Sequence, residues 1–134
     1  MLLKSFLVIA TAFVMTSAFA ADAVVSFQDA PKFYNHTKTV EGTIAATFCD
    51  DKRCFLNFDK DFRKFLSAVI SAENFSKFSK ATGKELQAEI EKMYVGKKVQ
   101  IIGAITEYKS KDASQPGRPQ IALAATTDIK VLAK

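Results

Sequence analysis

Hydrophobic and polar residues alternate along residues 37–48, TKTVEGTIAATF. The apolar members Val40, Ile44, Ala46 and Phe48 fall at even spacing, with Gly42 on the same face. This period of two, with frequent β-branched residues, predicts a strand that buries one face. A glycine inside such a strand predicts a bulge or a sharp bend.

A short charged loop, DDKR at residues 50–53, separates this strand from a second apolar run, CFLNF at residues 54–58. Two strands joined by a four-residue loop form a hairpin. In this hairpin Cys49 and Cys54 face each other as the last pair before the loop. Simple pairing then places Leu56 on the face of Thr47, not of Ile44. If Ile44 and Leu56 are both core residues, a bulge must lie between them.

The remaining pattern predicts three more strands and one helix. Residues 65–71 (FLSAVIS) read as a third strand, residues 97–108 as a fourth with Gly103 at its middle, and residues 119–132 as a fifth strand followed by a tail. Between the third and fourth, Leu86, Ile90, Met93 and Tyr94 form a helical stripe. Thr82 and Glu85 have capping-box spacing before it, and Gly96 follows it.

The order of elements over residues 38–134 is therefore β-β-β-α-β-β. Five strands in a closed Greek-key barrel, with one helix between strands three and four, is typical of the OB-fold. Residues 21–37 precede this domain as an irregular lead-in. They contain Pro31, and we expect a short strand or turn there, packed by Phe27, Phe33 and Tyr34. The pattern shows no repeat and no domain linker.

Several motifs resemble those of small bacterial OB-fold domains of the nucleic-acid-binding type. They are VEGTI (residues 40–44), FLNF (55–58), AVI (68–70), YVGKKVQIIGAITEY (94–108) and PQIALA (119–124). The resemblance covers residues 39–132 and implies an OB-fold. Residues 110–115 look inserted relative to that family, and the short cysteine-bearing hairpin is not a feature of it. Both differences fall on loops at the rim of the barrel.

The N-terminus has the pattern of a secretory signal peptide over residues 1–20. Lys4 precedes an apolar stretch at residues 6–15, and Ala18-Phe19-Ala20 is a small-residue cleavage site. The apolar stretch is too short to span a membrane comfortably, although a single anchor helix is the alternative. Cleavage predicts a mature chain of residues 21–134, in the periplasm or secreted.

Export gives the two cysteines a role. Exported chains meet oxidising conditions, so an even cysteine count predicts a disulfide, here Cys49–Cys54. The alternative is two reduced cysteines, one of them buried. Two cysteines and one histidine, His36, do not supply four zinc ligands. We therefore expect no metal and no cofactor.

Without the signal peptide the chain carries 18 Lys and Arg against 14 Asp and Glu, a net charge of +4. This mild basic bias suits a polyanionic partner, although many exported proteins share it. In OB barrels the ligand face is formed by strands two and three and two flanking loops. Basic groups and a candidate exposed ring gather there, and basic grooves with stacking rings bind single strands. The predicted nucleic-acid-binding residues are Lys52, Arg53, Phe55, Lys60, Arg63, Lys64, Lys109, Lys111 and Arg118.

Each of these residues has a simpler alternative. The residue type favours a core or half-buried place for Phe55, and the lysines and arginines of the turns are commonly just solvated. Asp50 and Asp51 would repel phosphate, and Asn57 would bond the backbone at a bulge.

Catalysis is not expected. The sequence shows no Ser/His/Asp or Cys/His constellation and no glycine-rich phosphate loop. Asp50 and Asp51, or Asp59 and Asp61, would serve a thermonuclease-type calcium site, but acidic turns explain them better.

Two hypotheses follow. The first is an exported, monomeric OB-fold module that binds nucleic acid such as single-stranded DNA with low sequence preference. The second is an exported OB domain that binds a protein, a small ligand or an envelope glycan, with a role in stress tolerance.

Overall fold

The computed structural model describes residues 23–132, so the predicted signal peptide lies outside the described residues. The fold is mainly β, as the alternation predicts. Its strands are β1 (Val25–Ser26), β2 (Thr37–Thr43), β3 (Ala46–Cys49), β4 (Arg53–Asn57), β5 (Ser67–Ser71), β6 (Lys98–Tyr108), β7 (Arg118–Ala122) and β8 (Ile129–Val131). The helices are the 3-10 turns η1 (Phe27–Phe33), η2 (Ala72–Lys77) and η3 (Thr126–Asp128), and the α-helix α2 (Gly83–Tyr94).

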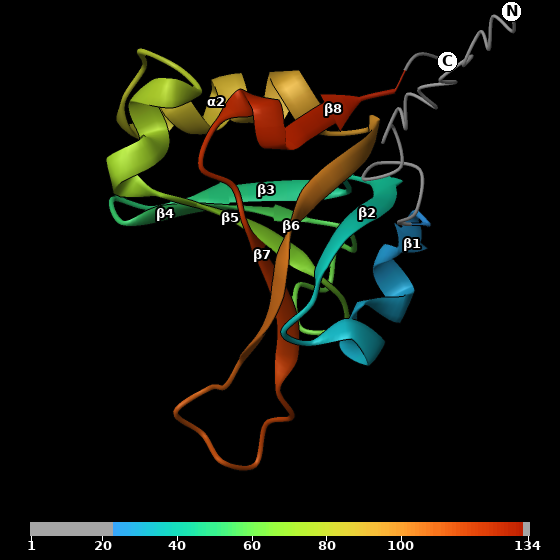
Figure 1. Cartoon of the computed structure of the whole chain (residues 1–134). Helices are drawn as coiled ribbons and strands as arrows, with labels where there is room; N and C mark the ends of the chain where they lie inside the picture. The colour runs from blue at the N-terminus through green and yellow to red at the C-terminus, as the bar shows by residue number, and fades with distance from the viewer. Residues whose placement is uncertain (1–22, 133–134) are drawn as a thin grey trace, which may run out of the picture.

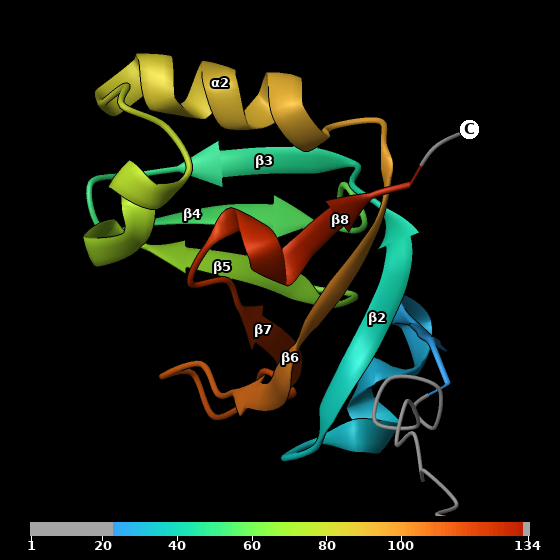
Figure 2. The ribbon, with the colours of Figure 1, turned by 45° about the horizontal axis from the view of Figure 1, so that its top comes forward.

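The strands pair along a path that returns to its starting segment. β2 pairs with β6, β6 with β7, β5 with β4 and β4 with β3, all antiparallel, while β7 and β5 are parallel. Only Ile44 and Ala45 separate β2 from β3. In Figures 1 and 2, β3, β4 and β5 form one layer, and β2 and β6 run across it. The result is a barrel-like arrangement around an apolar core.

The segment predicted as the first strand forms two strands, β2 and β3. The break between them is the bulge whose position the sequence did not determine. Ile44 donates its N–H to Lys97 O (3.1 Å), and Ala45 donates to Asn57 O (2.8 Å), so the chain changes partner here. Because a one-residue slip turns every later side chain to the other face, Ile44 and Leu56 are both fully buried. The same slip makes the predicted core position of Phe48 wrong, since 55% of this side chain is exposed.

The predicted fifth strand is likewise divided, into β7 and β8. β7 pairs with β5 and with the second half of β6, whereas β8 pairs with residues 99–101 of β6. The turn η3 lies between them, and the Asp128 carboxylate accepts the N–H groups of Ala124 and Ala125 there. The five segments that the sequence predicts as strands therefore contain seven strands, β2 to β8.

The lead-in packs on the barrel through Phe27. β1 is parallel to β2, and the ring of Phe27 stacks on Phe58 with 5.1 Å between centroids. Gly42 lies beneath these rings and pairs regularly with Val99, so the bulge expected at this glycine is absent. A Cβ atom at position 42 would lie 2.5 Å from the Phe27 ring and 2.6 Å from the Phe58 ring. Glycine is needed here for the close approach of the rings.

The helix α2 lies alongside β3 in Figure 2 and buries its predicted stripe. Leu86, Ile90 and Tyr94 are buried, and Gly96 follows at a φ of 79°, which glycine adopts readily. The predicted capping box is wrong, because Thr82 makes no side-chain hydrogen bond to the first turn. Within residues 23–132, no helix has the length and apolar character needed to cross a membrane.

We expect Gly42→Ala to lower the free energy of unfolding by about 1–3 kcal/mol, because the new methyl group overpacks two rings. Urea unfolding measures this change. Thr43→Ala, at the exposed next position of the same strand, is the matched control and should change stability by less than about 0.5 kcal/mol. Equal stability of Gly42→Ala and the unmodified protein would contradict the packing role of Gly42.

Candidate functional site

The outer face of β3, β4 and β5 carries a groove of about 500 Å³. Strand pairing sets its floor, because Phe48 lies opposite Phe55 and Asn57 lies opposite Ser67. We call this site the outer groove. Its lining residues are Ala46, Thr47, Phe48, Phe55, Asn57, Lys60, Phe62, Ser67 and Arg118.

Three phenylalanine rings make the outer groove apolar. Phe48 is 55% exposed, Phe62 is 51% exposed and Phe55 is partly buried. Phe48 and Phe62 are the two aromatic residues among the large hydrophobic side chains that are exposed in the described part of the chain. Exposed rings that share one groove make it a candidate binding site.

Arg118 places a guanidinium group between two rings at the edge of the outer groove. Its Cζ atom lies 5.0 Å from the ring centroid of Phe62 and 5.0 Å from that of Tyr108. One nitrogen, Nη1, donates a 3.4 Å hydrogen bond to Phe62 O. Stacking of this kind orients a planar cation and leaves its other donors available.

The floor of the outer groove is polar at one point. Ser67 Oγ donates a 2.7 Å hydrogen bond to Asn57 Oδ1, and both residues are buried. The main-chain O of Asn57 accepts Ala45 N–H at the strand break, whereas the side-chain oxygen is bonded to Ser67 and to no backbone N–H. Thr47 Oγ1, also in the lining, is buried without a hydrogen-bond partner.

The turn between β3 and β4 is bridged, as predicted, by a Cys49–Cys54 disulfide. Asp50 Oδ1 accepts the N–H groups of Lys52 and Arg53, each at 2.8 Å. These two backbone hydrogen bonds lower the pKa of Asp50 below its ordinary value. Asp50 is therefore an ionised turn residue.

The same turn separates its charges onto two sides. Lys52 and Arg53 line a hollow of about 350 Å³ together with Ser71 and Gln120. The guanidinium of Arg53 lies 5.9 Å from the ring centroid of Phe55, a residue of the outer groove, but the hollow and the outer groove share no lining residue. Asp50 and Asp51 instead line a different cleft, beside α2. These two acids, which were expected to repel phosphate, therefore lie on the side of the turn away from the outer groove.

The other predicted residues lie around the edge. Arg63 lines a hollow of about 310 Å³ that shares Phe62 and Arg118 with the outer groove, and it pairs with Asp61 at 3.1 Å. Lys109 pairs with Glu107 at 3.8 Å. Lys64 and Lys111 are exposed and line neither the outer groove nor these hollows. The structure therefore gathers Phe55, Lys60 and Arg118 in the groove, with Lys52, Arg53 and Arg63 beside it.

Sequence reasoning missed Phe48, Phe62 and Tyr108. Phe62 had a detectable signal, because it is an isolated ring in the charged turn DKDFRKF. Phe48 also had one, because pairing Cys49 with Cys54 in the hairpin places Phe48 directly opposite Phe55.

The acidic residues form turns. Asp59 Oδ1 accepts Asp61 N–H at 2.8 Å, and Asp61 Oδ1 accepts the N–H and Nε of Arg63. Among residues 23–132, no group of three or more His, Cys, Asp or Glu side chains is placed to hold a metal ion.

No protein-family model matches this chain, and no curated protein matches it either. Solved structures do. An aspartyl-tRNA synthetase from Entamoeba histolytica matches 85% of the chain at 18% identity and a TM-score of 0.53. An asparaginyl-tRNA synthetase from Pyrococcus horikoshii matches 81% at 16% identity and 0.49, and the S. pombe Stn1-ten1 complex matches 73% at 17% identity and 0.44.

The chain spans 22% of the length of each of these two synthetases and 59% of the matched Stn1-ten1 chain. At such identities a likeness shows the fold alone. Together with the strand path, the match to the Entamoeba histolytica enzyme supports the OB-fold that the sequence predicts.

We expect reduction of the Cys49–Cys54 disulfide to lower the free energy of unfolding by about 2 kcal/mol, the entropy of closing so short a loop. Urea unfolding with and without reductant measures the difference, and thiol titration verifies reduction. The double variant Cys49→Ala with Cys54→Ala is the control and should not respond to reductant. An unchanged urea midpoint after complete reduction would show that the bridge does not stabilise the fold.

Proposed function

We propose that this chain is an exported module that binds single-stranded nucleic acid, with low sequence preference, across the outer face of β3, β4 and β5. In this proposal the module is a binding protein without catalytic activity. It acts as a monomer in the periplasm or outside the cell after loss of residues 1–20. Its domain is a five-stranded Greek-key OB barrel with α2 between the third and fourth barrel strands.

One observation carries the proposal: the outer groove combines exposed rings with cations. Phe48 and Phe62 offer faces on which bases stack, while Arg118 and Lys60 offer positive charge for the phosphates. Aromatic platforms beside a basic track are how proteins bind single strands. The hollow that contains Lys52 and Arg53 extends the cationic surface along the same face.

Low sequence preference follows from the chemistry of the lining. Every base has a face that stacks on a ring, so stacking tolerates all four bases. Base-specific reading needs free donors and acceptors. Of the polar groups in the floor, the Ser67 hydroxyl and Asn57 Oδ1 are already bonded to each other.

The name of the Entamoeba histolytica structure, a tRNA synthetase, is compatible with this proposal but supports it only by analogy of fold. The argument for this chain rests on its own groove residues.

A protein partner is the second candidate, and the same exposed rings favour it, because aromatic residues are enriched in protein interfaces. The second hypothesis from the sequence also allows a small ligand or an envelope glycan in place of the protein, with a role in stress tolerance. The salt dependence of oligonucleotide binding separates it from the first.

We expect Phe48→Ala to weaken binding of a fluorescent oligothymidylate by about 5- to 150-fold, the value of one lost base stack. Fluorescence anisotropy at low salt measures the dissociation constant. Phe48→Tyr should retain binding, because a ring remains. Val131→Ala removes an exposed apolar group from β8, outside the outer groove, and should leave the affinity unchanged. Equal effects of the Phe48→Ala and Val131→Ala variants would exclude the outer groove as the stacking site.

We expect the affinity to fall with salt, and Arg118→Gln to reduce the log–log slope by about 0.7, the value of one phosphate contact on a single strand. The same anisotropy titration, repeated over a salt series, measures this slope. Lys130→Gln removes an exposed cation from β8. It should weaken binding, but it should reduce the log–log slope by less than the value of one phosphate contact. No binding at low salt, or binding that is indifferent to salt, would refute the nucleic-acid proposal and favour the protein partner.

A further inference from the structure

The hollow of about 350 Å³ that contains Lys52 and Arg53 is a second site on the outer face of the sheet. We call it the β5–β7 hollow. Val69 in this hollow is paired with Phe55 of the outer groove. Gln120 in the hollow is likewise paired with Ser67 of the outer groove. Because paired side chains are neighbours on one face of a sheet, a ligand that leaves the outer groove on this side reaches the hollow directly.

Every polar side chain that lines the β5–β7 hollow can donate a hydrogen bond. Lys52 and Arg53 form no ion pair within residues 23–132, whereas Arg63 and Lys109 at the edge of the outer groove are paired with acids. Ser71 is the N-cap residue of η2, but its hydroxyl makes no capping hydrogen bond. No acidic residue lines the hollow. The polar residues of its lining are Lys52, Arg53, Ser71, Thr106 and Gln120.

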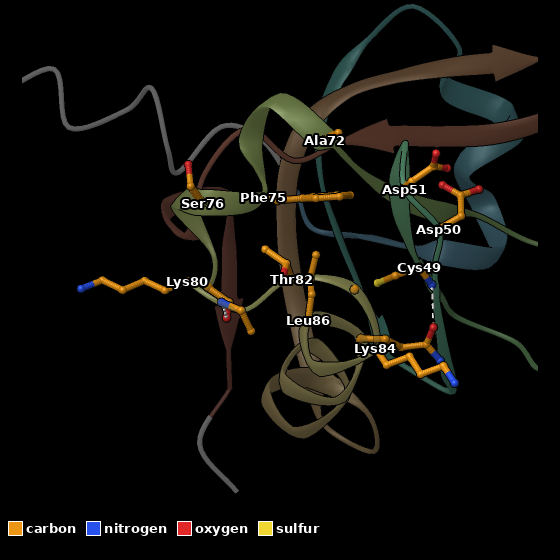
Figure 3. Close-up of a pocket in the computed structure, with 14 residues that line it drawn as sticks. Cys49, Asp50, Asp51, Ala72, Phe75, Ser76, Lys80, Thr82, Lys84 and Leu86 are labelled. Atoms are coloured by element: carbon orange, nitrogen blue, oxygen red, sulfur yellow. Dashed lines mark hydrogen bonds between the residues drawn. The ribbon is translucent and has the colours of Figure 1, made fainter.

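The bridged turn is held to the rest of the fold on both sides. Ala72 N–H, at the start of η2, donates a 2.9 Å hydrogen bond to Lys52 O. Cys49 N–H donates a 3.0 Å hydrogen bond to Gln87 Oε1 of α2, which Figure 3 marks as a dashed line. The disulfide adds a covalent tie within the turn. The backbone that carries the two cations is therefore fixed before a ligand arrives, which reduces the cost of binding.

The two acids of the bridged turn belong to another surface. Asp50 and Asp51 line a cleft of about 630 Å³ beside α2, and Figure 3 shows both among the residues of that cleft. Asp50 Oδ1 already accepts two backbone N–H groups of the turn. Its charge weakens the positive potential of the turn, but it places no carboxylate in the β5–β7 hollow. The hollow therefore favours an anion that accepts several hydrogen bonds.

This set of donors suits a terminal phosphate better than a phosphate inside a strand. A phosphate monoester carries between about −1.5 and −2 charges near pH 7 and has three strong acceptor oxygens. A phosphodiester inside a strand carries a single charge, and sugars occupy both of its ester oxygens. Lys52 and Arg53 offer positive charge, and three neutral side chains offer further donors. The monoester makes fuller use of these groups.

From this arrangement we propose that the β5–β7 hollow binds the terminal phosphate of the single strand whose bases stack in the outer groove, an inference that rests on the proposed nucleic-acid function. Lys52 and Arg53 pair with the phosphate charge. The side chains of Ser71, Thr106 and Gln120 donate to the phosphate oxygens. Because the hollow lies on one side of the outer groove, it accepts only one of the two ends of a strand.

The test compares forms of an oligothymidylate of about six nucleotides, a length within the range that one OB fold covers. The forms carry a 5′-phosphate, a 3′-phosphate, the methyl ester of either phosphate, or no terminal phosphate, with the dye on the opposite end. Fluorescence anisotropy with the whole mature chain measures each dissociation constant. One phosphorylated form should bind about two- to fivefold more tightly than the unphosphorylated form, the range for exposed ion pairs. Its methyl ester should lose most of this gain, because the ester carries less charge.

Matched variants assign the gain to the β5–β7 hollow. Lys52→Gln and Ser71→Ala should each reduce the ratio of the phosphorylated to the unphosphorylated affinity. Arg118→Gln, in the outer groove, should weaken both forms and leave the ratio unchanged. Lys64→Gln removes an exposed cation that lines neither site and should also leave the ratio unchanged. Because the ratio is taken within one variant, a loss of folded protein does not alter it.

Inorganic phosphate separates the end of a strand from free phosphate as the ligand. At constant ionic strength, millimolar inorganic phosphate should reduce the gain from the terminal phosphate and leave the affinity of the unphosphorylated form unchanged. NMR titration of inorganic phosphate alone, followed at the amide signals of Ser71 and Gln120, measures its dissociation constant. A value equal to or below that of the phosphorylated oligonucleotide would assign the hollow to free phosphate and overturn the strand-end proposal.

Three further outcomes overturn the inference. Equal affinity of all forms, or the same gain at both ends, would show that the hollow does not recognise a terminal phosphate, while the nucleic-acid proposal would stand. A gain that persists in both the Lys52→Gln and the Ser71→Ala variants would place the phosphate elsewhere. No binding of any form at low salt would refute the nucleic-acid proposal itself and this inference with it.

Discussion

The change of partner at Ile44 and Ala45 determines how this barrel is built. A single segment pairs with β6 before the break and with β4 after it, so the two layers are joined by covalent chain. The break also turns the face of β3. Ile44 enters the core, while Phe48 turns out to the solvent beside Phe55. Both the closed core and the aromatic outer groove therefore depend on one irregularity in one segment.

The bridged turn after β3 determines on which surfaces its four charged side chains lie. The turn DDKR contains two acidic and two basic residues, so its net charge is zero and does not by itself indicate a binding site. In space, its two cations lie on the outer face, and its two carboxylates lie beside α2. The disulfide and the Asp50 hydrogen bonds hold this separation. One short turn thus presents opposite charges to two surfaces.

Rings and cations in the outer groove support each other. Phe62 and Tyr108 flank the Arg118 guanidinium, which restricts a side chain that would otherwise lose much rotational freedom on binding. Phe62, in the turn between β4 and β5, and Arg118, at the start of β7, are far apart in sequence and meet only at the barrel surface. Contacts between such distant segments hold the rings and the guanidinium in fixed positions at the edge of the groove.

The sequence by itself determined the strand-rich character, the helix that buries Leu86, Ile90 and Tyr94, and the Cys49–Cys54 disulfide, because each depends on local periodicity or on a pair of cysteines. It also located Phe55, Lys60 and Arg118, since the order of strands places them on one face. It did not identify Phe48 and Phe62 as residues of the outer groove or Tyr108 as a neighbour of Arg118, and it predicted a capping box that Thr82 does not form. Only the tertiary structure decided these points, because a single slipped residue reverses which face is buried, and contacts between distant loops have no local pattern.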